Sequence, residues 1–280
     1  MMAQPLPAKL KSLVMRVCMF VLSIFIFENL FSQSHNPNKA FKRGEVLTYR
    51  VHYGLMDAGE ATITIAQDSI KFNNSPCYHV VGTGNSKNAF DWFFKVRDRY
   101  DSYIDEETLL PHFFMRRVNE GGFIINQDYR FNHTAKSVNV KRDGSDEARS
   151  TKGKVYTIPN STQDILSAFY YARNINLDEV KIGDVITIQT FFDEELFPLK
   201  IKLVGREVIS TRAGKIRCIK IHPLIQQGRV FKEEDDLTLW VSDDINRIPV
   251  RLQADVLVGS IKMDLKSYSN LANPIALVNK

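Results

Sequence analysis

The stretch PNSTQDILSAFYYARN, Pro159–Asn174, decides the fold that we predict for this chain. Ser161, followed three residues later by Asp164, is typical of an N-terminal helix cap with an acidic partner. The apolar residues that then recur at helical spacing are Ile165, Ala168, Phe169 and Ala172. Because this is the clearest amphipathic pattern and lies near the middle of the sequence, we predict a central helix over residues 161–173.

The segments on both sides of this helix alternate apolar and polar residues with the period of two that is typical of β-strands. Val46–Val51 and Asp184–Phe192 are clear examples, and Gly, Asn and Asp residues separate such runs. The pattern predicts a mainly β protein with one strongly curved antiparallel sheet or an incomplete barrel. We expect the helix at 161–173 to lie against the concave face, with its apolar stripe covered by the sheet.

The predicted domain runs over residues 41–270 and has two β-rich halves, 41–143 and 176–270, which a linker and the helix join over 144–175. Residues 271–280 are a predicted C-terminal tail. SYIDEETLLP (Ser102–Pro111) and LWVSDDINRIP (Leu239–Pro249) both pass from an aromatic strand end through an acidic turn to a proline. This similarity between the two segments could come from a duplication, or from the polar turns that any antiparallel meander requires.

The N-terminus has the pattern of an export signal. Basic residues precede an apolar run of eleven residues, Val17–Phe27, which is long enough for a signal peptide and too short to span a bilayer. We predict a signal peptide over residues 1–32, cleaved near Ser32, and a polar leader over 33–40. The alternative is an uncleaved membrane-anchoring segment. The prediction places the protein in the periplasm or outside the cell.

The charge and the cysteines limit the possible partners and cross-links. The formal net charge is +5, and the longest basic runs are pairs such as Lys141-Arg142, so the clustered charge of nucleic-acid-binding proteins is absent from the sequence. Beyond the signal peptide, Cys77 and Cys218 both lie in strand-like runs. An exported protein could bridge them, or both could remain buried thiols.

The sequence contains no local motif for a known chemistry. It has no HExxH, GxSxG, P-loop or dinucleotide-binding glycine pattern. Acidic runs such as Asp193–Glu195 and Asp243-Asp244 are expected to be solvated turns, with calcium binding or paired catalytic carboxylates as alternatives. We therefore expect no cofactor, no metal site and no enzymatic activity.

Aromatic residues near the helix and in two loops could serve either the core or a binding surface. The candidates for an apolar ligand or partner surface are Phe90, Trp92, Phe93, Phe94, Phe169, Tyr170, Phe192 and Phe197. Burial on both faces of a strand would explain the same pattern without a ligand.

Five stretches in order, FKRGEVLTYRVHYGLMDAGEATI, FKVRDRYDSYIDEETLLPHFF, DILSAFYYAR, STRAGKIRCIKIHP and LWVSDDINRIPVRL, resemble the bacterial domain of unknown function 3108 family. G-E-x-L-x-Y at 44–49 and L-W-x-S-D-D at 239–244 are the more specific pieces. The resemblance covers residues 41–268 and implies an exported envelope protein with no assigned activity. The organisation is also similar to that of periplasmic lipoprotein carriers, in which a curved sheet covers helices around an apolar cavity.

We therefore expect a non-enzymatic envelope protein that binds an apolar ligand, a lipid or a lipoprotein. One alternative is a structural or assembly factor that binds another envelope protein through an edge strand or an aromatic loop. A second alternative is a hydrolase whose site is assembled from distant residues. Nucleic acid is not an expected partner, and the oligomeric state stays open.

Overall fold

The computed structural model describes residues 38–92, 94–224, 237–255 and 259–278. The chain divides into two compact units, residues 1–36 and Pro37–Lys280, and all described residues belong to the second. The predicted signal peptide at 1–32 and the candidate Phe93 therefore lie outside the described residues. Within the described part, no helix has the length and apolar character needed to cross a membrane.

Most of the described residues form β-strands, as the alternating sequence predicts. The strands before the central helix are β1 (Val46–Tyr53), β2 (Met56–Ile65), β3 (Ile70–Phe72), β4 (Ser75–Ser86), β5 (Arg97–Asp105), β6 (Pro111–Glu120), β7 (Phe123–Asn132), β8 (Ser137–Gly144) and β9 (Thr151–Thr157). Those after it are β10 (Val185–Phe192), β11 (Glu195–Thr211), β12 (Gly214–Leu224), β13 (Leu237–Ser242), β14 (Pro249–Asp255) and β15 (Ser260–Ser269). The helical segments are α2 (Asn88–Asp91), the 3-10 turn η1 (Glu147–Arg149) and α3 (Ile165–Arg173).

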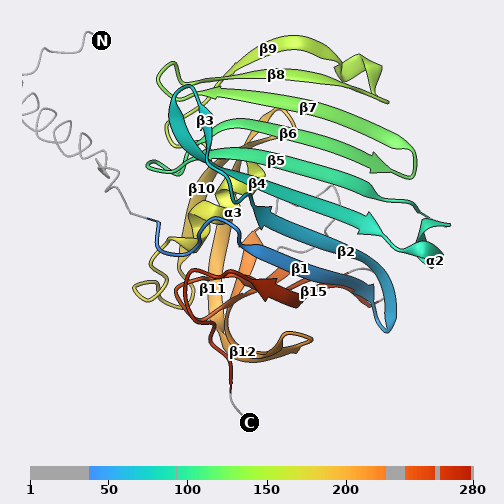
Figure 1. Cartoon of the computed structure of the whole chain (residues 1–280), viewed down its shortest axis with the longest axis vertical. Helices are drawn as coiled ribbons and strands as arrows, with labels where there is room; N and C mark the ends of the chain where they lie inside the picture. The colour runs from blue at the N-terminus through green and yellow to red at the C-terminus, as the bar shows by residue number, and fades with distance from the viewer. Residues whose placement is uncertain (1–37, 93, 225–236, 256–258, 279–280) are drawn as a thin grey trace, which may run out of the picture. The chain divides into compact units, whose positions relative to one another are not determined.

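These strands form one antiparallel sheet that does not close into a barrel. Its order is β10-β11-β12-β13-β14-β15-β1-β2-β4-β5-β6-β7-β8-β9, with β3 paired to β4. The last strand, β15, pairs with β1 and joins the two halves, while β9 and β10 are the two ends of the sheet. Figure 1 shows α3 behind β4 and β5 and in front of β10 and β11. The helix contacts both β5 and β10, which confirms the predicted incomplete barrel around a central helix.

The inner face of the sheet carries the core. One buried cluster includes Tyr49 and Leu265 between β1 and β15, and a second includes Val80 and Tyr170 between the sheet and α3. Ile63 packs against both clusters, so they form a continuous interior. Burial of apolar area at roughly 25 cal/mol per Å² makes this interior the main source of stability.

The helix begins four residues later than predicted. Asp164, not Ser161, is the N-cap: its carboxylate accepts from the backbone N–H groups of Leu166 and Ser167, and the Ser167 hydroxyl completes a capping box. Ser161 has a φ of 61°, which is incompatible with a helix start. Gln163 instead pairs with β10, accepting from Phe191 and donating to Gln189 through its backbone, so the sheet holds this segment extended.

Two further expectations can be compared with the structure. The polar stretch that begins at residue 144 was predicted to be a linker, but it includes η1 and the edge strand β9. This segment is a strand because Tyr156 and Lys154 pair with Val138 and Val140 of β8. Cys77 and Cys218 are both buried and unbridged, so of the two alternatives the structure has the buried thiols.

Candidate functional site

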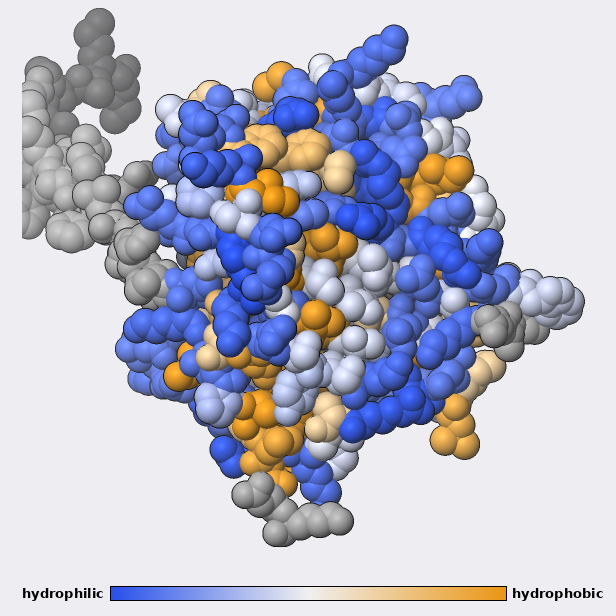
Figure 2. Space-filling view, in the orientation of Figure 1, coloured by the Kyte–Doolittle hydropathy of each residue, from blue (hydrophilic) through white to orange (hydrophobic). Residues whose placement is uncertain are grey.

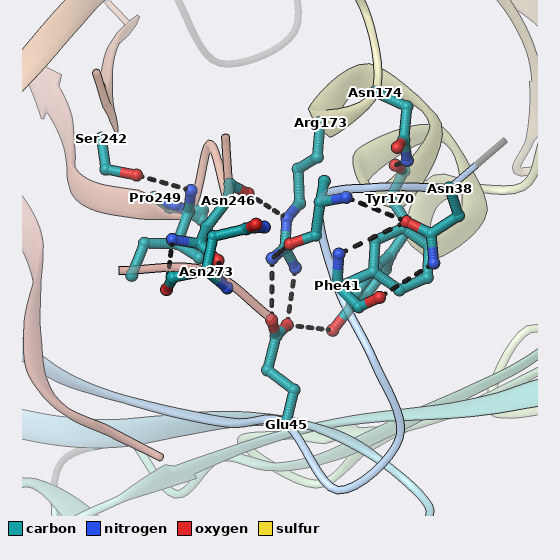
Figure 3. A network of polar contacts seen from close by, with 12 residues as sticks. Asn38, Phe41, Glu45, Tyr170, Arg173, Asn174, Ser242, Asn246, Pro249 and Asn273 are labelled. Carbon is teal, nitrogen blue, oxygen red and sulfur yellow. Dashed lines mark hydrogen bonds and ion pairs between the residues drawn. The ribbon is translucent and has the colours of Figure 1, made fainter. Parts of the chain in front are cut away.

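A buried ion pair links the end of α3 to the start of β1. Arg173 donates from Nη1 to Glu45 Oε1 over 2.6 Å and from Nη2 to Glu45 Oε2 over 2.8 Å, in a two-point pairing (Figure 3). The Tyr170 hydroxyl also donates to Glu45, over 3.4 Å. Both charged side chains are almost completely buried. Burial alone would lower the pKa of Arg173, but pairing with Glu45 raises it, so the guanidinium stays charged.

The same arginine connects both ends of the domain. Its Nε donates to the Asn246 carbonyl over 2.8 Å, and Nη2 donates to the Ala40 carbonyl over 3.1 Å. Asn246, in the turn between β13 and β14, donates in turn to the Asn273 carbonyl over 3.0 Å. Figure 3 shows these contacts converging from the N-terminal segment, the helix and the C-terminal part of the chain. We call Glu45, Tyr170, Arg173, Asn246 and Asn273 the helix lock.

The helix lock explains the two sequence pieces that carry the family resemblance. Glu45 belongs to the G-E-x-L-x-Y piece, and Asn246 follows the L-W-x-S-D-D piece by two residues. Tyr49, the last residue of the first piece, donates to the carbonyl of Pro249 over 3.2 Å. These segments are distant in sequence and meet around α3, so their chemistry is architectural: the donors and acceptors satisfy one another inside the protein.

The aromatic candidates from the sequence lie in three separate places. Tyr170 is fully buried and Phe169 packs beside it at 5.0 Å between ring centroids, so this pair belongs to the core around α3. Phe192 and Phe197 lie in the β10–β11 hairpin, where the Arg116 guanidinium stacks over the Phe192 ring at 4.9 Å. Phe90, Trp92 and Phe94 lie on or next to α2, so the structure does not gather the candidates into one surface.

The β10–β11 hairpin ends in an ion-pair cluster that holds it against the other half of the sheet. Arg142 donates to Asp193 over 3.0 Å and to Glu194 over 3.2 Å, and Arg149 donates to Asp193 over 3.0 Å. Burial alone would raise the pKa of Asp193, but these arginines lower it. The acidic run Asp193–Glu195 was predicted to be a solvated turn. It is a turn, but Asp193 and Glu194 form ion pairs that link the end of β10 to Arg142 of β8 and to Arg149, which precedes β9.

Exposed apolar side chains gather at one end of the sheet, which we call the apolar rim. Its members are Tyr53, Leu55, Met56, Trp92, Phe94, Phe123, Ile124 and Ile261, each at least 37% exposed. They lie at the β1–β2 turn, at α2 and its flank, at the β6–β7 turn and at the start of β15. In an antiparallel meander alternate connections fall at the same end, so the topology places these four connections together.

Two side chains of the apolar rim lie against turn glycines that are close in sequence to other rim residues. A Cβ on Gly121 would lie 2.6 Å from the Phe94 ring, and the Gly121 N–H donates to the Lys95 carbonyl over 2.8 Å. The Tyr53 hydroxyl lies 3.1 Å from the Cβ position of Gly259. Figure 2 shows two separate apolar groups at the right-hand side, one near the β6–β7 turn and one near the β1–β2 turn, with hydrophilic surface between them.

The apolar rim makes little contribution to the core. Leu55 is 100% exposed and Trp92 is 83% exposed, so folding buries little of the apolar area of either side chain. Exposed apolar groups that gather in one place typically mark a contact with a membrane or another molecule. The sequence pointed to Trp92 and Phe94 but not to Leu55 or Phe123, although apolar residues directly after turn glycines were a usable signal.

Three histidines pair with aspartates in different parts of the sheet. The Nε2–oxygen distances are 2.8 Å for His79 and Asp101, 3.1 Å for His112 and Asp105, and 3.2 Å for His52 and Asp264. Burial opposes the charge of Asp101, but hydrogen bonds from His79 and Arg99 lower its pKa to about 2. Within the described ranges, no group of three His, Cys, Asp or Glu side chains is arranged to hold a metal ion.

Comparisons with known proteins agree with this fold. The model of the family described as protein of unknown function (DUF3108) matches residues 48–266. The crystal structure of a β-barrel-like protein of domain of unknown function DUF1849 from Brucella abortus is similar, with a TM-score of 0.54 and 8% identity over 82% of this chain and 99% of that one. At this identity the similarity shows the fold alone. No curated protein matches the chain.

Two further solved structures have lower scores. A protein from Bacteroides fragilis, described as exported with a YmcC-like fold, has a TM-score of 0.31 and 11% identity over 82% of this chain and 99% of that one. A protein from Parabacteroides distasonis, described as a lipoprotein, has a TM-score of 0.28 and 10% identity over 81% and 96%. At these scores neither supports an argument about this chain.

Proposed function

The chain belongs to the DUF3108 family, whose description assigns no activity, and from its own geometry we propose that it is a non-enzymatic binding protein of the cell envelope. It uses the apolar rim to bind the acyl region of a lipid or of a lipoprotein. The observation that carries this proposal is the gathering of exposed apolar side chains at alternate connections, which lie at the same end of the sheet. Export through the signal peptide at 1–32 is part of the proposal.

The chemistry of the apolar rim favours lipid over a flat protein surface. Its side chains stand at the ends of separate turns, whereas a stable protein interface typically needs roughly 800 Å² of well-packed surface on each partner. Trp92 and Tyr53 carry a polar group on an apolar ring, and such rings prefer the boundary between lipid headgroups and acyl chains. Each apolar group inserted would contribute about 25 cal/mol per Å² removed from water.

Vesicle flotation of the purified protein tests the proposal. Replacement of both Leu55 and Trp92 by Ser should abolish binding and leave the unfolding midpoint unchanged, because both side chains are exposed. The matched control is Ile245→Ser, since Ile245 is 57% exposed in the β13–β14 turn at the opposite end of the sheet. A wild-type protein that binds no vesicles and carries no lipid after purification would contradict the proposal.

A second candidate function is an assembly factor that accepts a strand of another envelope protein. The outer edge of β10 favours it. Among the described strands β10 pairs in a ladder with β11, and Gln163 bridges the outer edge only from Gln189 to Phe191. Val185 and Thr187, which precede this bridge, are exposed. Thr187→Pro should then block capture of the partner, since proline cannot donate to an added strand. Loss of the same capture in the Leu55 and Trp92 variants would instead point to the apolar rim.

A further inference from the structure

The outer face of the sheet carries a polar groove directly behind the apolar rim. Two hollows of about 540 and 390 Å³ share Arg117 and Asn126 and so form one groove across β4 to β9. Arg117 pairs in register with Asn126, and strand alternation places both on the face opposite to the buried Gln127. Ile124 both lines the groove and belongs to the apolar rim, so the two surfaces are continuous.

Cations exceed carboxylates in this groove. The basic side chains that line it are Arg97, Arg99, Arg117, Lys141 and Lys152, and the acidic ones are Asp98, Asp128 and Asp143. Arg142 also contributes to the lining, but its guanidinium is bound to Asp193 and Glu194. Neither Lys141 nor Lys152 has an ion-pair partner within the described ranges.

Arg99 is positioned as an anion ligand. It stands directly opposite Arg117 across the β5–β6 ladder, and Asp128 pairs with Arg117 over 2.6 Å. Asp101, which is almost fully buried, holds Arg99 through Nε at 2.7 Å and Nη2 at 2.8 Å. The Arg99 side chain remains 53% exposed, and its Nη1 donors have no acceptor in the part of the chain that the structure describes.

We propose that this groove binds the phosphodiester headgroup of a bilayer phospholipid while the apolar rim enters the acyl region. This inference rests on the proposed function and names its ligand class. A guanidinium already fixed by a buried carboxylate can offer its remaining donors to phosphate oxygens at little further entropic cost. The two lysines add point charges beside it, and the aspartates can accept from headgroup ammonium or hydroxyl groups.

The test compares two vesicle surfaces of equal acyl composition. Phosphatidylcholine vesicles present an anionic phosphodiester in a headgroup whose net charge is zero, whereas digalactosyl-diacylglycerol vesicles present no phosphate. The wild-type protein should bind the phospholipid about tenfold more tightly, which corresponds to ~1.4 kcal/mol. Arg99→Gln, and separately Lys141→Gln with Lys152→Gln, should reduce phospholipid binding to the galactolipid level. The double lysine variant guards against a folding defect, because both lysines are exposed.

The control Lys215→Gln removes an exposed charge from β12, outside the groove, and should bind both vesicles as the wild type does. Equal wild-type affinity for the two vesicles, or unchanged binding in both groove variants, would overturn the headgroup site and leave rim binding intact. Binding of free glycerophosphocholine as tightly as of the phospholipid vesicle would also overturn it, since a soluble phosphate ester would then be the ligand. Failure to bind either vesicle would count against the proposed function itself.

Discussion

Arg173 and Glu45 form a two-point ion pair in the interior, 128 residues apart in the sequence, with N–O distances of 2.6 and 2.8 Å. Two further Arg173 donors, on Nε and Nη2, bind the carbonyl groups of Asn246 and Ala40. The cost of burying two charges is therefore offset by their pairing and by these two hydrogen bonds. This pair fixes α3 relative to both ends of the sheet.

Removal of one partner of this pair should strongly destabilise the protein. Glu45→Gln leaves the buried guanidinium without its counter-charge, and a loss of roughly 3–5 kcal/mol in the free energy of unfolding is expected. Urea denaturation followed by tryptophan fluorescence would measure it. The double variant Glu45→Leu with Arg173→Met should be more stable than Glu45→Gln, because no charge is then left buried without a partner. Equal stability of Glu45→Gln and the wild type would show that solvent reaches the pair.

Asp164 should make stability depend on pH. Burial raises the pKa of this N-cap carboxyl to about 6, above the ordinary value of 3.8. Between these two values the folded protein holds a proton that the unfolded chain has released, so stability falls as the pH rises through this range. A shift of about two units corresponds to about 3 kcal/mol. Asp164→Asn keeps a cap acceptor without the titrating group.

The measurement is the free energy of unfolding at pH 4.5 and pH 7.5 for the wild type and for Asp164→Asn. Because the interval from pH 4.5 to 7.5 covers about 1.5 of these two units, the decline with pH should be smaller in the variant by about 2 kcal/mol. Asp101 serves as an internal reference: its pKa is lowered to about 2, so its stabilising contribution is complete above pH 4.5 and does not change in this interval. The same decline in both proteins would contradict the assignment.

Local sequence patterns were sufficient to predict the class of fold. They were insufficient to predict which distant strands pair with each other. Alternation along β1 or β10 depends only on which face of a strand is buried, so it can be recognised in sequence. The pairing of β1 with β15 depends on the whole chain. The helix start at Ile165 differs from the prediction for the same reason, because β10 holds Gln163 extended through backbone hydrogen bonds that no local pattern contains.

Sequence analysis could identify only those residues of the candidate site that are marked by their immediate neighbours in the sequence. Trp92 and Phe94 stood out because aromatic residues cluster around α2. Tyr170 has the same sequence signal but is fully buried, since exposure is decided by what packs on the helix. Arg173 lies in the last turn of the helix, where a basic residue is favoured by the helix dipole whether or not it has a partner. Its partner Glu45 lies in the G-E-x-L-x-Y motif, which can be recognised in the sequence. Nothing in the sequence indicates that Glu45 contacts Arg173.

Both cysteines should be unreactive in the folded protein. Burial raises the pKa of the Cys77 thiol to about 11 and that of Cys218 to about 12, so almost no thiolate is present near pH 8. Ellman's reagent should therefore detect no thiol in a folded chain that carries Cys18→Ser, and two after unfolding in urea. Rapid labelling of one thiol before unfolding would contradict the buried positions of these side chains.

The β10–β11 turn combines unfavourable backbone angles with favourable charges, and its replacement should show which effect is larger. Asp193 and Glu194 have φ values of 50° and 70°, where Asn-Gly would be preferred. Relief of the backbone should return about 1 kcal/mol, whereas loss of the carboxylates leaves the buried Arg142 without partners at a cost of roughly 3–5 kcal/mol. Asp193→Asn with Glu194→Gly should therefore destabilise the protein by about 2 kcal/mol or more.

The matched control lies in the β3–β4 turn, where Asn73 and Asn74 have φ values of 49° and 68° and are exposed. Asn74→Gly places glycine in the same backbone geometry without removing a charge, so it should be neutral or stabilise by up to about 1 kcal/mol. Chemical denaturation of the two variants gives the comparison directly. If the Asn-Gly turn at 193–194 were as stable as the wild type, the ion pairs of Arg142 would not be what holds β10 against the other half of the sheet.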